Sequence, residues 1–554
     1  MQSAARHDHG ADGILLNNSF MSLTNEKFLG LYNKLNAEQK QAVDAIEGPV
    51  MVVAGPGTGK TQILTLRIAN ILLKTDAAPR NILALTFSES GANSMRHRLA
   101  SIIGASAYSV FINTFHGFCN DIIKNYPEDF PYIIGANNIT EVEQIQILKD
   151  LIIDTRLEFL KPFGDNFYFL RPILQNINQL KREGIDPVKF KTIVESEQKN
   201  FDQIEDLYHE KGLHKVKMKG DYQKQQKSIN KNKELSSIYE AYQDKLNEKR
   251  LYDYSDMIME VLTALEKNKD LLLILQEEHQ YILVDEHQDT NNAQNKIVEL
   301  LCNFHKSPNV FFVGDEKQAI FRFQGASLEN FLYFKTLYPD AKLVTLQENY
   351  RSTQNILNAA HSLLASPKLL NANVGHENKK IRIYEFEKPE TELYFIAKDI
   401  EEKIKSGVKP NEIAVLYRDN RDAFPVVHML EKFGVNYIVR SDQDILADSD
   451  IKKFIVLLKA INNFGKSEYL IAAMHIDFLH IDPLDIYKIL EYSNRSHIHI
   501  AHVLESKLLL EPLALTAPEN IFKFYNNLKK WSTVSHNKNF IDFFEEIIRE
   551  SGFL

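Results

Sequence analysis

The stretch that decides the fold reads Val50-Met51-Val52-Val53-Ala54-Gly55-Pro56-Gly57-Thr58-Gly59-Lys60-Thr61. It opens with an apolar run typical of a buried strand, and residues 62–73 after it carry apolar side chains at helical spacing. A strand, a glycine-rich loop and a helix in this order predict a phosphate-binding loop, because backbone N–H groups and the positive end of the helix then face phosphate oxygens. Ala54 stands where the usual pattern has glycine, and the dense spacing of the three glycines offsets this change.

The loop predicts a site for ATP and Mg²⁺. Lys60 would reach the β- and γ-phosphates, and Thr61 would place its hydroxyl group on the metal ion. Taken alone, the loop is also compatible with an ordinary glycine-rich turn whose lysine is solvated.

A second apolar strand, Tyr281 to Val284, ends in two adjacent carboxylates. Asp285 would hold Mg²⁺ through water, and Glu286 would orient and deprotonate the attacking water. A surface acid pair is the alternative, which the presence of Lys60 and Thr61 disfavours. The long separation between positions 60 and 285 predicts a helical subdomain inserted between the two halves of the site.

Two further apolar strands, 82–87 and 110–115, both end in Thr-Phe. Ligands of parallel α/β sheets lie outside the carboxyl ends of the strands, where an exposed aromatic side chain can stack on a base. Phe87 and Phe115 are therefore either stacking residues or ordinary core residues.

Four further positions are candidates for contact with ligand. Gln318 follows the buried strand 310–313, where a sensor of the γ-phosphate would lie, and Phe321 and Phe323 flank Arg322 as a candidate stacking platform. Gln39 completes a capping box with Asn36 or meets the edge of an adenine, and by itself the capping box is favoured.

Composition bounds the class of protein. The 554 residues exceed one core, and 44% hydrophobic and 25% charged residues are typical of a globular chain. The net charge of −9 does not exclude a local basic groove, and a segment with eight lysines at 211–233 is either a DNA contact or a solvated excursion. Two cysteines imply no disulfide framework and fit a cytoplasmic protein, and no apolar run is long enough for a membrane span.

We expect the following division of the chain. Residues 1–22 form a disordered tail or an extended start, 23–116 and 250–342 a first α/β ATPase domain, and 117–249 its helical insertion. Strands at 343–346, 381–386, 413–417 and 437–439 predict a second, partial α/β domain over 343–465. Residues 466–554 would start a second helical insertion.

The motifs together resemble superfamily 1 DNA helicases of the UvrD/Rep/PcrA type. The resemblance covers about residues 25–465 and rests on seven motifs in order: Leu35–Gln39, Ala54–Thr61, Thr86-Phe87, Thr114-Phe115-His116, Val284–Thr290, Gly314–Ala326 and Asn349-Tyr350-Arg351-Ser352. Segments 253–256 and 180–184 look like further landmarks of the family in the insertion. The resemblance implies RecA-like P-loop motor domains and an ATP-dependent enzyme that moves 3′ to 5′ on single-stranded DNA and its junctions with duplex.

The resemblance also implies a role for each matching residue. Lys60, Glu286, Gln318 and Arg351 would be catalytic, with Arg351 supplied as an arginine finger from the second, facing domain. The loop Ala54–Thr61 would bind ATP, Gln39 and Tyr350 would contact the adenine, and Thr61 and Asp285 would hold Mg²⁺. The residues implied in DNA binding are Phe87, Thr114, His116, Phe321 and Phe323.

Several positions depart from the family pattern. His287 stands where phenylalanine is usual, Ser90 where lysine is common, Phe323 where tryptophan is frequent, and Gln324 where arginine is usual. The motifs that the family has further on are not found, so we expect the chain to be the N-terminal portion of a longer helicase, with a role in DNA repair or replication. Two other hypotheses stay open: a nucleotide-gated DNA-binding module that does not unwind, and the N-terminal part of a helicase–nuclease fusion.

Overall fold

The computed structural model describes residues 25–208, 217–318, 328–364, 370–440, 449–535, 538 and 540–553. The chain divides into two compact units, Met1–Ile381 and Arg382–Leu554, which are considered separately.

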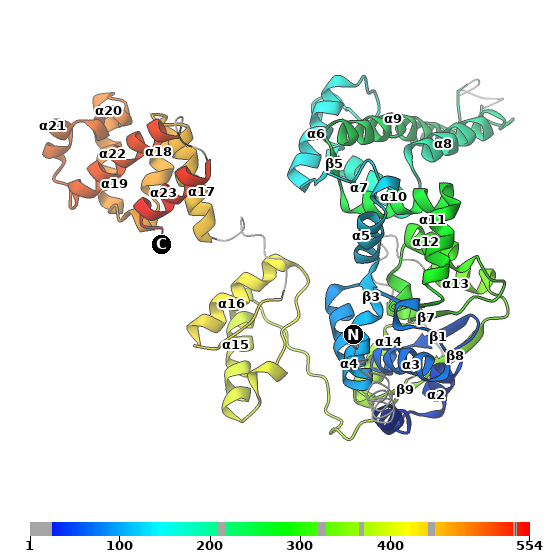
Figure 1. Cartoon of the computed structure of the whole chain (residues 1–554). Coiled ribbons are helices and arrows are strands. Elements are labelled where there is room, and N and C mark those ends of the chain that lie inside the picture. The colour runs from blue at the N-terminus through cyan, green and yellow to red at the C-terminus, as the bar shows by residue number, and fades with distance from the viewer. Residues whose placement is uncertain are drawn as a thin grey trace, which may run out of the picture. The chain divides into compact units, whose positions relative to one another are not determined.

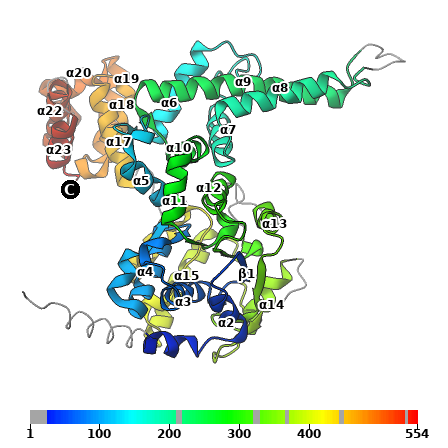
Figure 2. The ribbon, with the colours of Figure 1, turned by 45° about the vertical axis from the view of Figure 1, so that its right-hand side comes forward.

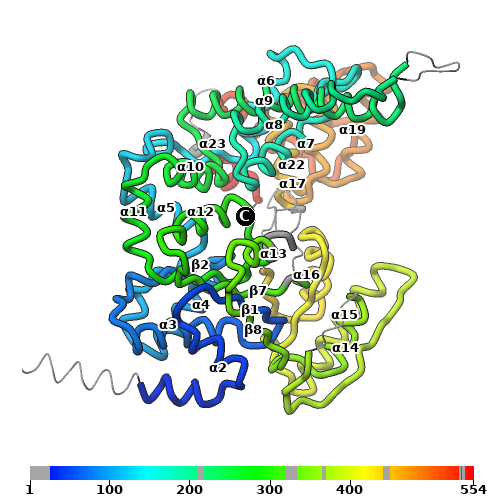
Figure 3. Tube along the Cα trace, turned by 90° about the vertical axis from the view of Figure 1, so that its right-hand side faces the viewer, coloured from blue at the N-terminus to red at the C-terminus, as the bar shows by residue number. Residues whose placement is uncertain are grey.

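The first unit is organised around a parallel sheet of six strands. The strands are β1 (Val50–Ala54), β2 (Ile82–Thr86), β3 (Phe111–Thr114), β6 (Tyr281–Val284), β7 (Val310–Gly314) and β8 (Lys342–Leu346). Their spatial order is β3-β2-β6-β7-β1-β8, and Figure 3 labels β2, β7, β1 and β8 of this sheet. Because all of the pairings are parallel, the carboxyl ends of β1, β6 and β7 meet at one edge of the sheet.

Helices cover both faces of this sheet (Figure 1). Alternate strand residues point to opposite faces, so Val50 and Val52 belong to one core and Met51 to the other. The first face packs against α2 (Ala37–Asp44), α3 (Lys60–Lys74) and α4 (Glu89–Ile103). The opposite face packs against α5 (Phe115–Asn125), α10 (Tyr254–Lys267), α11 (Lys269–Glu278), α12 (Asn292–Cys302) and α13 (Leu328–Leu337).

An insertion between β3 and β6 forms its own helical core. It contains α6 (Glu141–Asp154), α7 (Leu170–Arg182), α8 (Pro187–Asp202) and the long α9 (Gly220–Glu248). Figure 1 shows these helices at the end of the unit remote from α2, and Figure 2 shows α8 and α9 side by side. The short strands β4 (Asn137–Asn138) and β5 (Leu251–Tyr252) pair in parallel where the chain enters and leaves.

The helical character expected for this insertion is confirmed, but its expected start at residue 117 is wrong. Helix α5 buries Phe118, Cys119 and Ile122 against the sheet and belongs to the motor core. The chain therefore enters the inserted helices only after α5, because the apolar side of this helix has the sheet as its partner.

The strand expected to open a second sheet at residues 343–346 instead extends the first one. β8 pairs with β1 from Val50–Lys342 to Ala54–Leu346, and Val344 and Leu346 are buried in the first core. The expectation was wrong because an apolar run does not reveal which neighbour it pairs with. After β8, the chain forms β9 (Glu348–Asn349), α14 (Gln354–Ser362) and β10 (Asn371–Ala372), and β9 pairs with β10.

The regular elements of the second unit are all helices within its described residues. It begins with α15 (Pro389–Lys405) and α16 (Ala423–Lys432), which share a small core. A larger core around the buried Trp531 joins α17 (Ser449–Asn462), α18 (Ser467–Met474), α19 (Pro483–Ser496), α20 (Ile500–Glu505), α21 (Lys507–Leu510), α22 (Pro518–Val534) and α23 (Phe540–Ser551). The second helical segment thus begins with α17, before the expected position 466.

The strands expected at 381–386, 413–417 and 437–439 are not paired in the described part of the chain. A strand needs a paired neighbour for its N–H and C=O groups, and no such pairing is found for these segments among the described residues. Some of their apolar side chains are exposed, with Ile383 at 93% and Leu416 at 94%, whereas Ile413 and Val415 are half-buried against the core of α15 and α16.

Within the residues described, no helix has both the length and the apolar character that crossing a bilayer requires.

Candidate nucleotide and nucleic-acid sites

The loop between β1 and α3 has the geometry of a phosphate cradle. Gly57 and Gly59 adopt positive φ angles of 71° and 93°, a region that glycine enters without steric cost. The Thr58 hydroxyl donates to the carbonyl of Gly55 at 2.7 Å and closes the turn. Helix α3 starts at Lys60, so its free N–H groups point into the loop, where an anion would be stabilised.

Lys60 and Glu286 form the central ion pair of the site. The Lys60 ammonium lies 2.6 Å from the Glu286 carboxylate, and the lysine side chain is only 11% exposed. Glu286 follows β6 in a left-handed conformation (φ 48°), which turns its side chain toward the loop. The predicted lysine and the second predicted carboxylate are therefore brought together from strands β1 and β6.

Asp285 lies beside this pair at the end of β6. Its backbone N–H donates to Leu85 at 2.8 Å, and its carboxylate accepts from the N–H of Glu286 at 3.0 Å. Burial raises the pKa of Asp285 to about 7, Glu286 adds to the rise, and Lys60 opposes it. A buried carboxylate of this kind is suited to a cation, because a bound cation offsets the cost of its charge.

A chain of hydrogen bonds runs from Glu286 to Gln318. The Gln288 amide donates to Glu286 at 2.7 Å, and its oxygen accepts from the backbone N–H of Asp315 at 3.0 Å. Gln318 donates to the Asp315 carboxylate at 2.9 Å. The predicted sensor is thus linked to the predicted base through Gln288, which was quoted within its motif but not singled out as a site residue.

The segment 349–351 packs directly on the loop. The Asn349 side chain is fully buried, its amide donates to the Pro56 carbonyl, and its oxygen accepts from the N–H of Arg351 at 2.9 Å. The N–H of Tyr350 donates to the Gly57 carbonyl at 2.8 Å. Asn349 therefore fixes the position of Arg351, a role that the sequence did not reveal.

Arg351 lies in the same compact unit as the loop, because β8 extends the first sheet and carries the following residues past Gly57. Its role as an arginine finger supplied by a second motor domain stays a prediction.

Gln39 forms the predicted capping box. Its backbone N–H donates to Asn36 at 2.8 Å, its side-chain oxygen accepts from the N–H of Asn36 at 3.1 Å, and its amide donates to Thr58 at 2.9 Å. The capping box is confirmed, and contact between Gln39 and an adenine stays a prediction. Tyr350 is 41% exposed and accepts a hydrogen bond from Asn36 at 3.1 Å, so it lies at the same edge of the loop.

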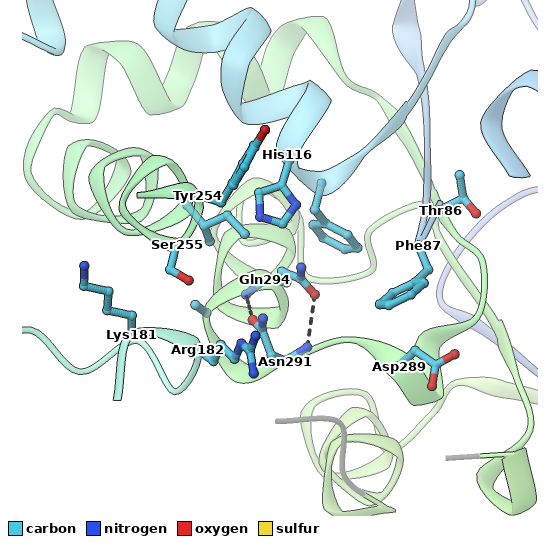
Figure 4. A pocket seen from close by; sticks show the side chains of 13 residues that line it. Thr86, Phe87, His116, Lys181, Arg182, Tyr254, Ser255, Asp289, Asn291 and Gln294 are labelled. Carbon is cyan, nitrogen blue, oxygen red and sulfur yellow. Dashed lines mark hydrogen bonds between the residues drawn. The ribbon is translucent and has the colours of Figure 1, made fainter. Parts of the chain in front are cut away.

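A second site, a pocket of about 230 Å³, opens beyond the ends of β2 and β3. Figure 4 shows Phe87 on one side of the pocket and His116 and Tyr254 on the other. Phe87 is 42% exposed, so the stacking interpretation is favoured over the core interpretation for this residue, whereas Phe115 is buried. The rings of His116 and Tyr254 meet edge to face at 5.9 Å.

Three other predicted DNA-binding positions have different outcomes. Thr114 is buried, caps α5 by accepting from Gly117 at 3.0 Å, and donates to Glu89 at 2.9 Å, so it positions His116 rather than lining the pocket. Phe321 and Phe323, together with Gln324, lie outside the described residues.

The pocket also contains side chains that sequence reasoning did not assign to it. Arg182 comes from the insertion and Tyr254 from the start of α10. Burial lowers the pKa of His116, and Arg182 lowers it further, so the imidazole is held neutral beside a cation. The only sequence signal was that both residues fall in segments that resemble family landmarks.

A buried ion cluster holds Arg182 and Tyr254 in place. Lys181 lies 2.6 Å from both Asp253 and Asp256, and all three side chains are more than nine-tenths buried. Burial by itself would lower the pKa of Lys181, but the two carboxylates outweigh it and hold the pKa above its ordinary value. Because Lys181 precedes Arg182 and Asp253 precedes Tyr254, the cluster ties the insertion to the motor core at the pocket.

One short segment belongs to both sites. Asp285 and Glu286 lie at the nucleotide loop, and Asp289, Asn291 and Gln294 line the pocket. Asn291 and Gln294 form a capping box at the start of α12, which fixes this end of the segment. Only a few residues of backbone therefore separate Glu286 from the residues that line the pocket.

A parallel α/β sheet with a glycine-rich loop, a lysine and a paired carboxylate defines the class of P-loop nucleotide-binding proteins. Family models refine this class: the UvrD/REP helicase N-terminal domain matches residues 35–339, and the UvrD-like helicase C-terminal domain matches residues 344–548. The chain belongs to the UvrD/REP helicase family.

Curated relatives give the same result. An "ATP-dependent DNA helicase PcrA" of Staphylococcus epidermidis is 30% identical over 530 residues, which cover 94% of this chain and 66% of that protein. A protein of the same name from Staphylococcus aureus is 28% identical over 530 residues, with the same coverage. The chain thus spans slightly less than two thirds of the length of the relatives it matches.

We predict that Gly57→Ala weakens nucleotide binding by at least about tenfold. The added Cβ would lie 2.7 Å from both Arg351 and Asn349, at a φ that costs a non-glycine residue about 1–2 kcal/mol. Binding of a fluorescent ATP analogue measures the effect. Gly164→Ala is the matched control, since Gly164 also has positive φ but no neighbour within 4 Å. Equal affinity of Gly57→Ala and the wild type would contradict the proposed packing.

Asp285→Asn should change how stability depends on pH in the Mg²⁺-free chain. The folded pKa of about 7 exceeds the ordinary value of 3.8, so the folded state binds more protons between these values. The free energy of unfolding contributed by this group therefore falls as pH rises from about 4 to about 7. We expect Asp285→Asn to raise the urea midpoint more at pH 8 than at pH 5, and a gain that is equal at both pH values would refute this assignment.

Lys181→Met should destabilise the first unit by about 3–5 kcal/mol, because it leaves two buried carboxylates without their cation. Urea unfolding followed by circular dichroism measures this loss. The triple variant Lys181→Met/Asp253→Asn/Asp256→Asn should recover part of it, since no charge then stays buried. The cluster would be unimportant if the single variant unfolded within about 0.5 kcal/mol of the wild type.

Proposed function

We propose that this chain carries the motor of an ATP-dependent DNA helicase that moves 3′ to 5′ along single-stranded DNA. The observation that carries the proposal is the segment 285–294, which contributes to the nucleotide loop at one end and to the aromatic pocket at the other. ATP hydrolysis at the loop would thereby alter the grip on a stacked base.

At the nucleotide site, the loop Ala54–Thr61 and Lys60 would hold the phosphates. Thr61 and Asp285 would hold Mg²⁺, which would draw charge from the γ-phosphate. Glu286, released from Lys60 when phosphate takes its place, would orient and deprotonate water. Gln318 would sense the γ-phosphate, and Arg351 would stabilise the transition state, a role worth ~10³–10⁵ in rate in P-loop enzymes. Gln39 and Tyr350 would contact the adenine.

At the nucleic-acid site, Phe87 and His116 would contact bases, with Thr114 as the capping residue behind them, and Phe321 and Phe323 would extend the platform. Base stacking on such side chains is worth ~1–3 kcal/mol per base and tolerates any sequence. Arg182, beside His116, would supply charge for a phosphate. The substrates would be single strands and their junctions with duplex, in repair or replication in the cytoplasm.

In this proposal, the first α/β core, which includes α5 and β8, acts as the motor, and its helical insertion and the later segments act as its partners in the cycle. The second helical segment begins with α17.

Lys60→Ala tests the proposal. The variant should lose DNA-stimulated ATP hydrolysis by about a hundredfold or more, because the γ-phosphate loses its cation. It should keep its affinity for single-stranded DNA without nucleotide, since the pocket is untouched. Lys74→Ala is the matched control, because Lys74 lies on the same helix with its side chain 52% exposed.

Strand displacement on a duplex with a 3′ single-stranded tail separates the two proposals. Displacement by the wild type but not by Lys60→Ala supports a helicase. Stimulated hydrolysis without displacement would instead support a nucleotide-gated DNA-binding module. Hydrolysis that DNA does not stimulate would overturn both.

A further inference from the structure

A groove of about 570 Å³ lies on the helical insertion, away from both sites described above. It runs between the loop before α7 and one side of α9. Its aromatic and basic lining residues are Phe159, Phe163, Tyr168, Phe169, Lys227 and Lys231. It shares no residue with the nucleotide loop or with the pocket around Phe87 and His116.

Two of the four aromatic side chains of this groove are exposed, whereas Phe159 and Phe169 are half-buried. The Phe163 side chain is fully exposed at 110%, and the Tyr168 side chain is 65% exposed. A phenylalanine in this position gains none of the stability that burial of its ring would give, so its exposure calls for an explanation. The preceding backbone is held in place, because the Glu234 carboxylate on α9 accepts from the N–H groups of residues 158, 159 and 160 at 2.7–3.1 Å. The rings are thus presented from an anchored loop.

The basic side chains form a stripe on α9. Lys224, Lys227 and Lys231 follow at helical spacing, so they share one side of the helix over roughly 10 Å at 1.5 Å per residue. The Lys231 ammonium lies 4.4 Å from the centre of the Phe169 ring. Lys224 is near Asp221 at 3.8 Å, whereas Lys227 and Lys231 form no ion pair with any residue that the structure describes.

The acidic residues around the groove do not cancel this charge. Glu158 and Asp165 also line it, and Asp165 accepts from the backbone N–H of Phe167 at 2.8 Å. Glu234 lies one turn after Lys231 on the same side of α9. Its carboxylate already accepts hydrogen bonds from three backbone N–H groups of the loop. The two lysines are therefore available to an anion that lies along the rings.

We propose that this groove binds a segment of single-stranded nucleic acid, with bases stacked on Phe163 and Tyr168 and phosphates beside Lys227 and Lys231. Aromatic faces next to aligned cations match the alternation of bases and phosphates, and they require no particular sequence. Single strands fit better than duplex, because the base faces of a duplex are covered by their neighbours. The proposal rests on the proposed function for its substrate and adds a second contact on the insertion.

Two paired variants test the groove in the full chain. Phe163→Ala/Tyr168→Ala should weaken binding of a fluorescein-labelled 40-mer of deoxythymidine about tenfold and leave the salt dependence unchanged. Lys227→Glu/Lys231→Glu should weaken it by at least as much and lower the slope of log K against log salt by about 1–2. Fluorescence anisotropy without nucleotide measures both effects.

Matched controls separate these effects from general ones. Tyr108→Ala/Tyr132→Ala removes two rings that are 64% and 61% exposed elsewhere in the same unit. Lys403→Glu/Lys405→Glu makes the same change in net charge on α15. Both controls should bind the 40-mer within twofold of the wild type, and circular dichroism should show that every variant is folded.

The outcomes are distinct from those of the motor test, because binding is measured without ATP. Affinities of both groove variants within twofold of the wild type would overturn the proposal even if hydrolysis is stimulated by DNA. An equal loss of affinity for a blunt 20-base-pair duplex in the aromatic variant would overturn the assignment to single strands. The proposal stands if the losses occur with the 40-mer alone, whether or not the chain hydrolyses ATP.

Discussion

Parallel pairing of β6, β7 and β1 is the constraint on which the rest of the molecule depends. It sets the ends of three strands side by side, so that Lys60 meets Glu286, and Gln288 links Glu286 to Asp315, although these residues are far apart in sequence. The 2.6 Å pair between Lys60 and Glu286 is the direct product. Displacing β1 or β6 would leave the Lys60 ammonium, whose side chain is 11% exposed, without its partner, which is a costly state.

The two candidate sites are connected by hydrogen bonds and a short stretch of chain. Gln288 joins Glu286 to Asp315 and Gln318, and the backbone from Glu286 to Gln294 ends in the pocket. Gly314 lies against this connection, since a Cβ there would meet the Gln288 oxygen at 2.6 Å. If Glu286 rearranges when phosphate binds, Gln288 and the groups bonded to it would be displaced with it. Such a displacement could reach Gln318 and the pocket without a large motion within the unit.

The insertion contributes more than a cover for the core. Its Lys181 pairs with Asp253 and Asp256 at the start of α10, which fixes Arg182 and Tyr254 at the pocket, and its far side displays Phe163 and Tyr168 beside the lysines of α9. Ionic groups buried to this extent rarely add stability over apolar ones, so we infer that the cluster sets the relative position of two subdomains. The insertion thus contributes a basic group at the pocket and both basic and aromatic groups at the groove.

The sequence by itself determined the local chemistry. The order of strand, loop and helix around Lys60, the acid pair at Asp285 and Glu286, and the capping box at Gln39 are encoded by neighbouring residues, and each was predicted with its residue numbers. The class of fold followed because buried parallel strands are continuous apolar runs that alternate with helices.

Only the tertiary structure decided which distant segments meet. The run 343–346 looked like the start of a new sheet, yet it pairs with β1, and this places Asn349 and Arg351 on the loop. Arg182 and Tyr254 became pocket residues through a buried lysine, and Phe163 became part of a groove through Glu234. Periodicity tells which side of a segment is buried, but pairing depends on long-range hydrogen bonds and ion pairs whose partners are far away in the chain.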